Sequence, residues 1–479
     1  MHNLTVMIKY KNMLWIVLLC ATVVAFSGLT WIPIDTHEAF VLLSAQHMLD
    51  SGDWVIPFSN GLPRLTKPPL NYWLSAMVSL LSGSSHIQPW HGRLPSALAG
   101  IGLVLLTAVS GRKLFDERVG ILAAAITASC SGYFYYTHSA RPEMLYSLLC
   151  ALAIVAYIHA RESTKGKTVA TYTMWVAFGA ATLCKGPQFP VILLLVFAID
   201  QYWSGNNLRQ VRDVLKPVGG LILMALISLP WWLLLHNRLG GEGLSGTQLS
   251  GTLINITLTN IVPYYFYRSL QLLLPWIIFL PALAMLGKHF DQRNIKLLAL
   301  LVLVPAIILT FGPQKRWYYI LPAMMPMSLM LAAGILLWCE KKLPGRRAFV
   351  GLAGFAIVCV LVFTLAGFTK SMWPNERFSR LQLALMMNQN NTSNIPIVAW
   401  GVSPEVYAFY TGKIISNVSG PSEIVNTIEK APQGKIFLLL KNKFLEILPL
   451  NIKTEVLGKS VGDDEQSILV IAWRSPIQN

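Results

Sequence analysis

The sequence predicts an α-helical, polytopic membrane protein that ends in a small α/β domain. Of its 479 residues, 54% are hydrophobic and only 13% are charged, whereas a soluble domain is about one quarter charged. Long apolar runs recur along the chain, and each approaches the roughly 20 residues that a membrane-spanning helix needs. The runs are continuous rather than alternating, which indicates a bundle of helices and not a barrel of strands.

The formal net charge of +16 would suggest a nucleic-acid ligand in a soluble protein. Here the basic residues lie in short loops between apolar runs, a pattern typical of topology signals and lipid contacts. The six cysteines lie in or beside apolar segments and form no C-x-x-C pair, so we expect neither a disulfide framework nor a cysteine metal site. His37, His91 and His138 lack paired helical spacing, and we expect no metal there.

The spans follow from these runs. The first follows Lys9 and Lys11, and its apolar core is longer than that of a signal peptide. Every second connection is basic, which puts the N-terminus inside and, with an odd count, the C-terminus outside. We expect about eleven spans: 13–30, 95–111, 119–138, 142–160, 168–185, 187–203, 217–236, 268–287, 296–312, 317–338 and 349–368.

Residues 31–90 are the longest polar interruption near the start of the chain, and we expect them to form an extracytoplasmic loop with interfacial helices. Asp35 and Glu38 have the spacing of a capping box. They predict a helix over 36–50, closed by Gly52. A second segment, 70–81, is apolar but too short to span, so we expect an interfacial helix.

The last part of the chain, 369–479, contains no spanning run. Short β-rich pieces at 395–400, 435–440 and 467–473 alternate with a helix-like piece at 422–431, which predicts a soluble extracytoplasmic α/β domain. No glycine-rich phosphate motif follows its first strand. We therefore expect residues 1–368 to form a transmembrane domain that carries the chemistry, with 369–479 outside the membrane.

Candidate site residues are those that contradict the topology pattern, because outer loops should be poor in lysine and arginine. Ionisable groups at span ends on that side mark functional sites by default. Cations beside carboxylates suit an anionic substrate that arrives within the membrane, such as a lipid-linked phosphate. Lysine and arginine would hold the phosphate, and a carboxylate would take a proton from the acceptor. The candidates are Lys67, Arg141, Lys185, Lys315 and Arg316 with Asp35, Glu38 and Glu143.

Each candidate also has a structural interpretation. Asp35 and Glu38 could serve only as a helix cap, and Lys67 could be a charge at the lipid headgroups. Lys185 before Gly-Pro is typical of a helix C-terminus. Arg141 and Glu143 lie two residues apart and do not face each other on a helix, so a salt bridge between them is a weak explanation. The pair at 315–316, followed by Trp-Tyr-Tyr, could anchor a helix at the membrane interface.

Two other classes of function remain open at this point. A transporter or lipid flippase would need repeated span pairs and ionisable groups at mid-membrane, whereas the halves of this chain show no clear repeat. A membrane scaffold that presents the C-terminal domain would not explain cations from four separate loops.

Seven short motifs follow one another along the chain. They read Asp35-Thr-His-Glu38, Gly52-Asp-Trp54 with Pro57, Lys67-Pro-Pro-Leu-Asn-Tyr-Trp73, Arg93-Leu-Pro-Ser96, Arg141-Pro-Glu143-Met-Leu145, Lys185-Gly-Pro187 and Lys315-Arg-Trp-Tyr-Tyr-Ile-Leu-Pro322. In this order they resemble the C-type glycosyltransferases that use polyprenyl-phosphate sugars, in particular the branch that contains lipid A aminoarabinose transferases and protein O-mannosyltransferases. The resemblance extends over about two thirds of the chain, from 31 to 326, and the C-terminal domain is also similar.

The resemblance implies a role for each matching residue. Asp35 would be the carboxylate nearest the reacting sugar, as a base or as a stabiliser of positive charge at the anomeric carbon. Glu143, where the family usually has Asp, would be a second carboxylate in the cavity. The family commonly has an acid directly beside Asp35, and the aminoarabinose transferases have one before Lys67, where this chain has Thr66. The phosphate and donor contacts would come from Lys67, Lys185, Lys315, Arg316, Tyr72 and Tyr319.

The reaction implied is an inverting transfer from polyprenyl (undecaprenyl) phosphate to lipid A, a glycan or a protein. It would take place at the outer face of a bacterial inner membrane and need no cofactor or metal, because the cations would neutralise the leaving phosphate. We expect no nucleic-acid partner.

Overall fold

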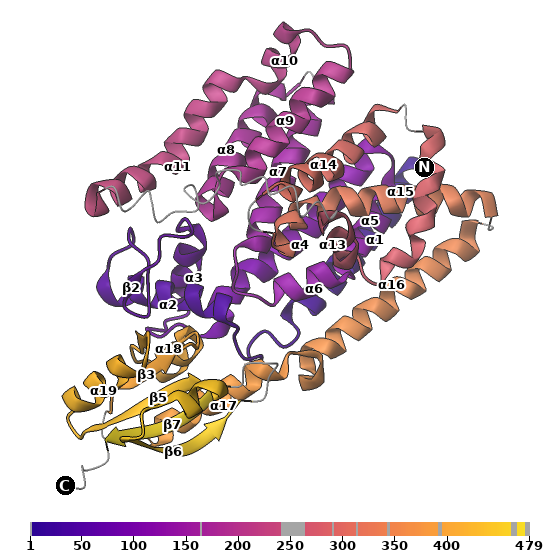
Figure 1. Ribbon diagram of the computed structural model, residues 1–479. Helices are drawn as coiled ribbons and strands as arrows, with labels where there is room; N and C mark the ends of the chain where they lie inside the picture. The colour runs from indigo at the N-terminus through magenta and orange to yellow at the C-terminus, as the bar shows by residue number, and fades with distance from the viewer. Residues whose placement is uncertain are drawn as a thin grey trace, which may run out of the picture. The chain divides into compact units, whose positions relative to one another are not determined.

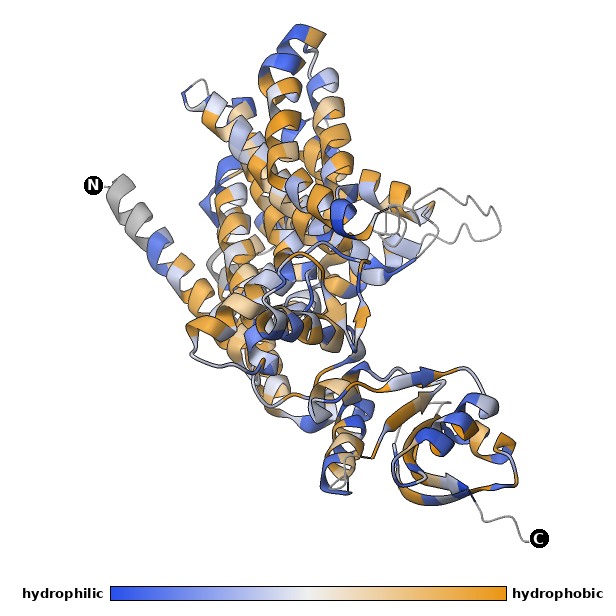
Figure 2. Ribbon diagram, turned by 90° about the vertical axis from the view of Figure 1, so that its left-hand side faces the viewer, coloured by the Kyte–Doolittle hydropathy of each residue, from blue (hydrophilic) through white to orange (hydrophobic). Residues whose placement is uncertain are grey.

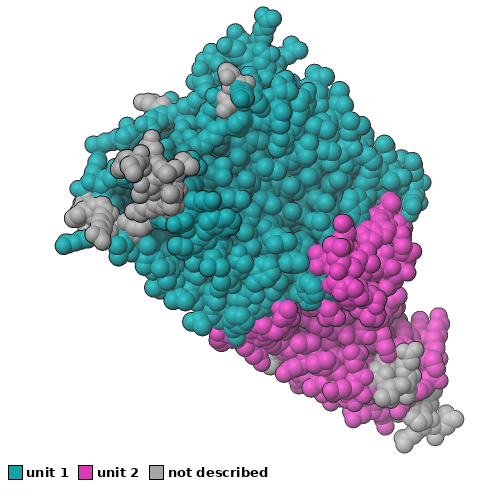
Figure 3. Space-filling view, turned by 180° about the vertical axis from the view of Figure 1, so that it is seen from behind, with its two compact units in different colours: residues 1–29, 65–74, 90–368 teal, residues 30–64, 75–89, 369–479 magenta. Residues whose placement is uncertain are grey.

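The computed structural model describes residues 2–162, 165–240, 264–289, 292–312, 315–342, 345–390, 395–460 and 467–474. The described chain is mostly helical and divides into two compact units (Figure 3). Unit 1 comprises residues 1–29, 65–74 and 90–368, and unit 2 comprises 30–64, 75–89 and 369–479. The chain therefore enters unit 2 early, returns to unit 1, and completes unit 2 only in its last quarter.

Unit 1 is built from helices whose apolar residues run along most of their length (Figures 1 and 2). Their bounds are α1 His2–Phe26, α4 Pro89–Leu114, α5 Glu117–Ala128, α6 Ser131–Thr137, α7 Glu143–Glu162, α8 Lys167–Lys185, α9 Gln188–Trp203, α10 Leu208–Leu215, α11 Pro217–Leu239, α13 Tyr264–Leu272, η3 Trp276–His289, α14 Arg293–Thr310, η4 Trp317–Ala323, α15 Met324–Lys342 and α16 Gly345–Phe368.

The length and composition of these helices are those of a multi-pass membrane protein. Within the described ranges, six helices are long and apolar enough to cross a membrane, or up to eight if two bent pairs each count as one span. The six are Pro89–Leu114, Glu143–Glu162, Leu208–Leu239, Arg293–Thr310, Trp317–Lys341 and Val350–Phe368.

Two segments that we expected to be continuous spans are bent. Residues 119–138 form α5 and α6, which meet at 55°. Residues 268–287 form α13 and η3, which meet at 116°. Pro275, which has no N–H to continue a helical ladder, lies in the second break. At the first break, the Ser129 hydroxyl donates to the Ala125 carbonyl at 2.5 Å, a local bond that competes with helix continuation.

Small residues let the helices of unit 1 approach closely. A Cβ added to Gly220 of α11 would lie 1.9 Å from the Trp175 ring of α8, so only glycine allows this contact. The Trp175 indole N–H donates to the Leu215 carbonyl at 2.7 Å, which satisfies the polar atom of a side chain that is 1% exposed. This contact joins α8, whose last residue is Lys185, to α11.

Unit 2 contains a five-stranded sheet in the order β4-β3-β5-β7-β6. β3 is parallel to β4 and β5, whereas β7 is antiparallel to β5 and β6. The strands are β3 Ile397–Trp400, β4 Ser416–Val418, β5 Lys435–Lys441, β6 Ile452–Lys459 and β7 Ser467–Arg474. Three of them, β3, β5 and β7, lie within or overlap the predicted β-rich pieces.

Helices pack on both faces of this sheet, and strand residues alternate between the faces. Ile424 and Ile428 of α19 pack with Leu438 and its same-face neighbours, whereas α17 and α18 pack with Phe437 and Leu439 on the other face. The helices are α17 Asn375–Asn390, α18 Glu405–Thr411 and α19 Pro421–Lys430, with the 3-10 turns η5 Lys370–Met372 and η6 Asn442–Ile447.

The early part of unit 2 follows the predicted capping signals. α2 spans Thr36–Ser51 and ends at Gly52, which adopts the left-handed conformation with φ 70°. A two-residue hairpin, β1 Phe58–Ser59 with β2 Leu62–Pro63, follows it. The next helix, α3 Leu70–Leu81, begins in unit 1 and ends in unit 2.

Candidate anion-binding site

The candidate site in unit 1 is built around Glu143, the first residue of α7. Its side chain is fully buried, and three cations from separate segments lie against it. The Lys185 Nζ lies 3.3 Å from Glu143 Oε1, and the Lys67 Nζ lies 3.6 Å from the same oxygen. The Arg141 Nε donates to Glu143 Oε2 at 3.3 Å. We call these four residues the Glu143 cluster.

Local structure explains why each member of the Glu143 cluster points inward. Glu143 starts a helix, where a negative charge is favourable next to the positive end of the helix dipole. Lys185 ends α8, where a positive charge is favourable. The segment before α7 is held by two hydrogen bonds to its carbonyls: Asn71 Nδ2 donates to Ala140 at 3.1 Å, and Ser96 Oγ donates to Arg141 at 3.1 Å.

The sequence analysis considered a salt bridge between Arg141 and Glu143 a weak explanation, but the structure contains this salt bridge, so that interpretation was wrong. The argument assumed that both residues lie on one helix, where side chains two positions apart diverge. α7 begins only at Glu143, and Arg141 lies in the non-helical turn before it. The side chain of Arg141 can therefore turn back toward the carboxylate.

Aromatic rings line the cations of the Glu143 cluster. Tyr318 is the main contact, since its ring centroid lies 4.4 Å from Arg141 Cζ and 4.9 Å from Lys185 Nζ. Tyr319 lies 5.0 Å from Lys185 Nζ. The sequence analysis named Tyr319 and missed Tyr318, because adjacent residues in a Trp-Tyr-Tyr run give no signal of which ring faces the site.

Tyr136 of α6 is a second residue that the sequence analysis missed. Its ring lies 5.8 Å from Arg141 Cζ and 5.2 Å from the Trp317 ring. The side chain is 1% exposed, and within the described chain its buried hydroxyl has no hydrogen-bond partner. A buried hydroxyl without a partner is uncommon and costs roughly 1–3 kcal/mol, so it marks a position where a ligand acceptor could bond.

The net charge of the Glu143 cluster indicates which ligands it could bind. Three cations face one carboxylate, so these four side chains carry a net charge of about +2 in a buried environment. An anion bound beside these cations would be stabilised by their charge. The arrangement therefore suits an anionic ligand, and the aromatic rings suit one with an apolar or sugar portion.

The other candidates of unit 1 have different surroundings. Arg316 is exposed, and its backbone N–H donates to the Tyr265 hydroxyl at 3.2 Å. Lys315 is half-buried, just before η4. Tyr72 of α3 is buried, with 2% of its surface exposed.

Asp35 and Glu38 lie in unit 2 and form the predicted capping box. Asp35 Oδ1 accepts from the Glu38 N–H at 2.8 Å, and Glu38 Oε2 accepts from the Asp35 N–H at 3.1 Å. Arg377 of α17 also contacts both carboxylates, at 2.8 Å from Asp35 and 3.2 Å from Glu38. The sequence analysis missed Arg377, because it lies 342 residues from Asp35.

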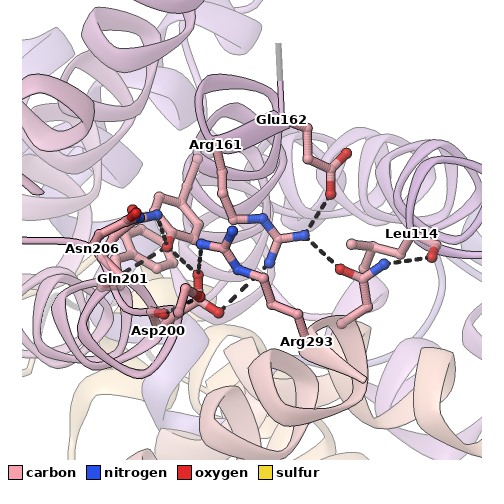
Figure 4. Close-up of polar contacts among 11 residues, drawn as sticks. Leu114, Arg161, Glu162, Asp200, Gln201, Asn206 and Arg293 are labelled. Carbon is pink, nitrogen blue, oxygen red and sulfur yellow. Dashed lines mark hydrogen bonds and ion pairs between the residues drawn. The ribbon is translucent and has the colours of Figure 1, made fainter. Parts of the chain in front are cut away.

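A second ion cluster, around the buried Asp200, lies at the other end of α7 (Figure 4). Asp200 of α9 is the acid, with Arg161 Nη1 at 3.6 Å and Arg293 Nη2 at 3.2 Å. The Tyr157 hydroxyl donates to the same carboxylate, and Arg161 also pairs with Glu162. We call these five residues the Asp200 cluster. Its two arginines balance its two acids, so the cluster is neutral.

The family comparison matches the part of the chain that carries the Glu143 cluster. Residues 66–232 match the family model described as dolichyl-phosphate-mannose-protein mannosyltransferase. This range contains all four members of the cluster. The chain is thus a membrane protein in which residues 66–232 are similar to this class of transferase.

Curated relatives within that class are named undecaprenyl phosphate-alpha-4-amino-4-deoxy-L-arabinose arabinosyl transferase. The one from Shewanella sediminis is 26% identical over 379 residues, which cover 74% of this chain and 65% of the relative. The one from Pseudomonas aeruginosa is 26% identical over 389 residues, covering 77% of this chain and 68% of the relative. The chain therefore spans about two thirds of the length of the curated relatives it matches.

Solved structures share the fold. ArnT from Cupriavidus metallidurans, in a crystal structure with undecaprenyl phosphate, has a TM-score of 0.77 at 16% identity. The match covers 97% of this chain and 98% of that one. The Archaeoglobus fulgidus oligosaccharyltransferase has a TM-score of 0.60 at 13% identity, over 91% of this chain and 70% of that one.

Proposed function

We propose that this protein is a membrane glycosyltransferase that moves a sugar from a polyprenyl phosphate, in bacteria undecaprenyl phosphate, to lipid A, a glycan or a protein. The observation that carries the proposal is the Glu143 cluster, a buried site with a net charge of about +2 and aromatic walls. The phosphodiester of such a donor carries one negative charge and the released polyprenyl phosphate carries up to two, so the charge of the cluster favours the leaving group as it forms. The names of the curated relatives and the ligand of the Cupriavidus structure support the same class of donor.

In the proposed mechanism, Lys67, Arg141 and Lys185 bind the donor phosphate. The acceptor oxygen attacks the anomeric carbon on the face opposite the phosphate, which inverts the configuration. As the new C–O bond forms, the bond from the anomeric carbon to the phosphate oxygen breaks, and the electron pair stays on that oxygen. The three cations stabilise this developing charge, as preorganised donors do at other leaving groups.

The proposed carboxylates have separate roles. Asp35 accepts the proton of a hydroxyl acceptor or stabilises positive charge at the anomeric carbon, and Glu38 caps the helix that carries Asp35. Glu143 is already paired with three cations, which suits an orienting role better than proton transfer. Lys315, Arg316, Tyr72 and Tyr319 complete the proposed donor pocket.

The proposed topology has eleven spans. The six long helices and two bent pairs supply eight, and α1, α8 and α9 supply the other three. The basic loops place the N-terminus in the cytoplasm of a bacterial cell. The site and the C-terminal segment, with its sheet flanked by helices, would then lie on the outer side of the inner membrane.

The test is transfer from polyprenyl phosphate aminoarabinose in isolated membranes, with lipid A, glycans and envelope proteins as acceptors and mass spectrometry as the readout. We expect transfer by the wild type and loss of it in Lys67→Ala and Asp35→Asn. The matched control is Arg118→Ala, which removes an exposed ion pair with Glu340. Equal transfer by all of these variants would remove the proposed site. Lipid movement without any sugar transfer would instead favour a flippase.

A further inference from the structure

Arg377 lies between the two carboxylates at the start of α2, inside unit 2. Its Nη2 donates to Asp35 Oδ2 at 2.8 Å, and its Nη1 donates to Glu38 Oε2 at 3.2 Å and to the Pro33 carbonyl at 3.3 Å. The Arg377 side chain is 6% exposed. An arginine held in a fork between two carboxylates fixes both of them, because its donors are planar and rigid.

The C-terminal segment contacts the residues on both sides of Asp35. The Ile34 N–H donates to the Tyr410 hydroxyl at 2.9 Å, and Arg380 Nη1 donates to Thr36 Oγ1 at 2.9 Å. Further along the same loop, Asn60 and Ile415 exchange two hydrogen bonds of 2.8 Å. The loop that carries Asp35 is therefore held at several points by residues that come more than 300 positions later.

These contacts leave Asp35 oriented but accessible. Its Oδ1 bonds to the Glu38 N–H and its Oδ2 bonds to Arg377, so the carboxylate has one preferred orientation. The Asp35 side chain keeps 20% of its surface exposed, whereas that of Glu38 has none. Of the two acids that Arg377 contacts, only Asp35 can reach a substrate.

We propose that Arg377 is a positioning residue for Asp35, so that the C-terminal segment forms part of the catalytic machinery. Arg377 fixes the direction in which Asp35 presents its carboxylate, and the segment 369–479 fixes Arg377. This inference rests on the proposed function, because it assumes that Asp35 acts on the sugar or the acceptor. It predicts that a change in α17 slows the chemical step without weakening donor binding.

The experiment measures steady-state transfer by full-length Arg377→Gln and Arg377→Lys protein. We expect kcat of Arg377→Gln to fall by about 10- to 100-fold, since small misplacements of a reacting group have effects of this size. The KM for the donor should stay within about twofold, and Arg377→Lys should recover part of kcat. The matched control is Arg474→Gln, which removes an exposed arginine–carboxylate pair with Glu429 in the same unit.

A double-mutant cycle separates positioning from a structural role. If Arg377 acts through Asp35, Asp35→Asn and the double variant Asp35→Asn with Arg377→Gln should transfer at the same residual rate. Additive losses, or a folded Arg377→Gln with wild-type kcat, would overturn the inference. If Arg377→Gln does not fold, Arg377→Lys decides in its place, and failure of both to fold would make Arg377 a structural tie only.

The outcomes also separate this inference from the proposed function. Absence of transfer by the wild type, or transfer at the wild-type rate in both Lys67→Ala and Asp35→Asn, removes the proposed function. Loss of transfer in Lys67→Ala and Asp35→Asn, with unchanged kcat in folded Arg377→Gln, keeps the proposed function and removes only the role of Arg377.

Discussion

The two ends of α7 carry ion clusters around a buried carboxylate, Glu143 at one end and Asp200 at the other, and the clusters differ in charge balance. α7 has 20 residues, a length of about 30 Å, which matches the hydrocarbon core of a bilayer. At its first residue, three cations surround Glu143 and leave an excess of about +2. At its last turn, Arg161 and Arg293 are balanced by Asp200 and Glu162.

The difference teaches how a buried ion cluster can be assigned to binding or to structure. A neutral cluster whose groups bond to one another resembles a tie between helices. The Asp200 cluster has this character, since Tyr157 donates to Asp200 and Arg161 donates to Asn294 at 2.6 Å. The Glu143 cluster has an excess of cations instead, which favours the proposed role in binding an anion.

The largest effect is expected when one cation from each end of α7 is substituted and the rates of transfer are compared. Lys185→Ala should lower the rate of transfer by about 10²–10³-fold, because it removes a preorganised charge from the leaving phosphate. Arg293→Gln should leave the rate per folded molecule close to that of the wild type. The measurement is initial transfer rate, normalised to folded protein by size-exclusion chromatography. An equal loss of transfer rate in both variants would contradict the assignment of the Glu143 cluster to binding and of the Asp200 cluster to structure.

The second prediction compares the two central acids by stability. Asp200→Asn should lower the free energy of unfolding by about 3–5 kcal/mol, because it leaves two arginines near a neutral amide. Glu143→Gln should destabilise the protein without ligand for the same reason. Added polyprenyl phosphate should stabilise Glu143→Gln more than the wild type, since the anion replaces the lost charge, and should stabilise Asp200→Asn by the same amount as the wild type.

This second comparison is read from thermal unfolding in detergent with and without polyprenyl phosphate. The expected sign is a larger ligand-induced rise in Tm for Glu143→Gln than for the wild type, and an unchanged rise for Asp200→Asn. A larger rise for Asp200→Asn would place the anion at the wrong end of α7.

The smallest effects are expected when the hydroxyl groups of two buried tyrosines, one in each half of α7's surroundings, are removed and stability and donor binding are compared. Tyr136→Phe removes a hydroxyl without a partner, so the free energy of unfolding should stay the same or rise slightly, whereas donor binding should weaken by about 1.5–3 kcal/mol. Tyr157→Phe removes the donor to Asp200. It should cost about 1–3 kcal/mol of stability and leave donor binding unchanged.

Binding of a polyprenyl phosphate analogue and Tm, measured on the same samples, check this pair. The comparison fails if Tyr136→Phe destabilises the protein as much as Tyr157→Phe does. That result would mean that the Tyr136 hydroxyl already has a partner in the protein.

The sequence by itself determined the elements that depend on local pattern. Apolar runs give helices wherever the backbone must satisfy its own hydrogen bonds, and the long helices of unit 1 overlap the predicted spans. The spacing of Asp35 and Glu38 predicted the capping box, and Gly52 ends the helix as predicted. The position of cations at span ends identified Lys67, Arg141 and Lys185 before any contact was known.

Only the tertiary structure decided which of these groups meet. Arg141 reaches Glu143 because α7 starts at Glu143, two residues after Arg141. Sequence periodicity does not locate the start of a helix to within two residues. Arg377 reaches Asp35, and Arg293 reaches Asp200, across separations of 342 and 93 residues. Helix starts, caps and spans depend on residues that are neighbours along the chain. The charge balance of a cluster depends on side chains from distant parts of the chain that packing brings together. The sequence could therefore list the charges, but only the fold could show that one cluster has an excess and the other has none.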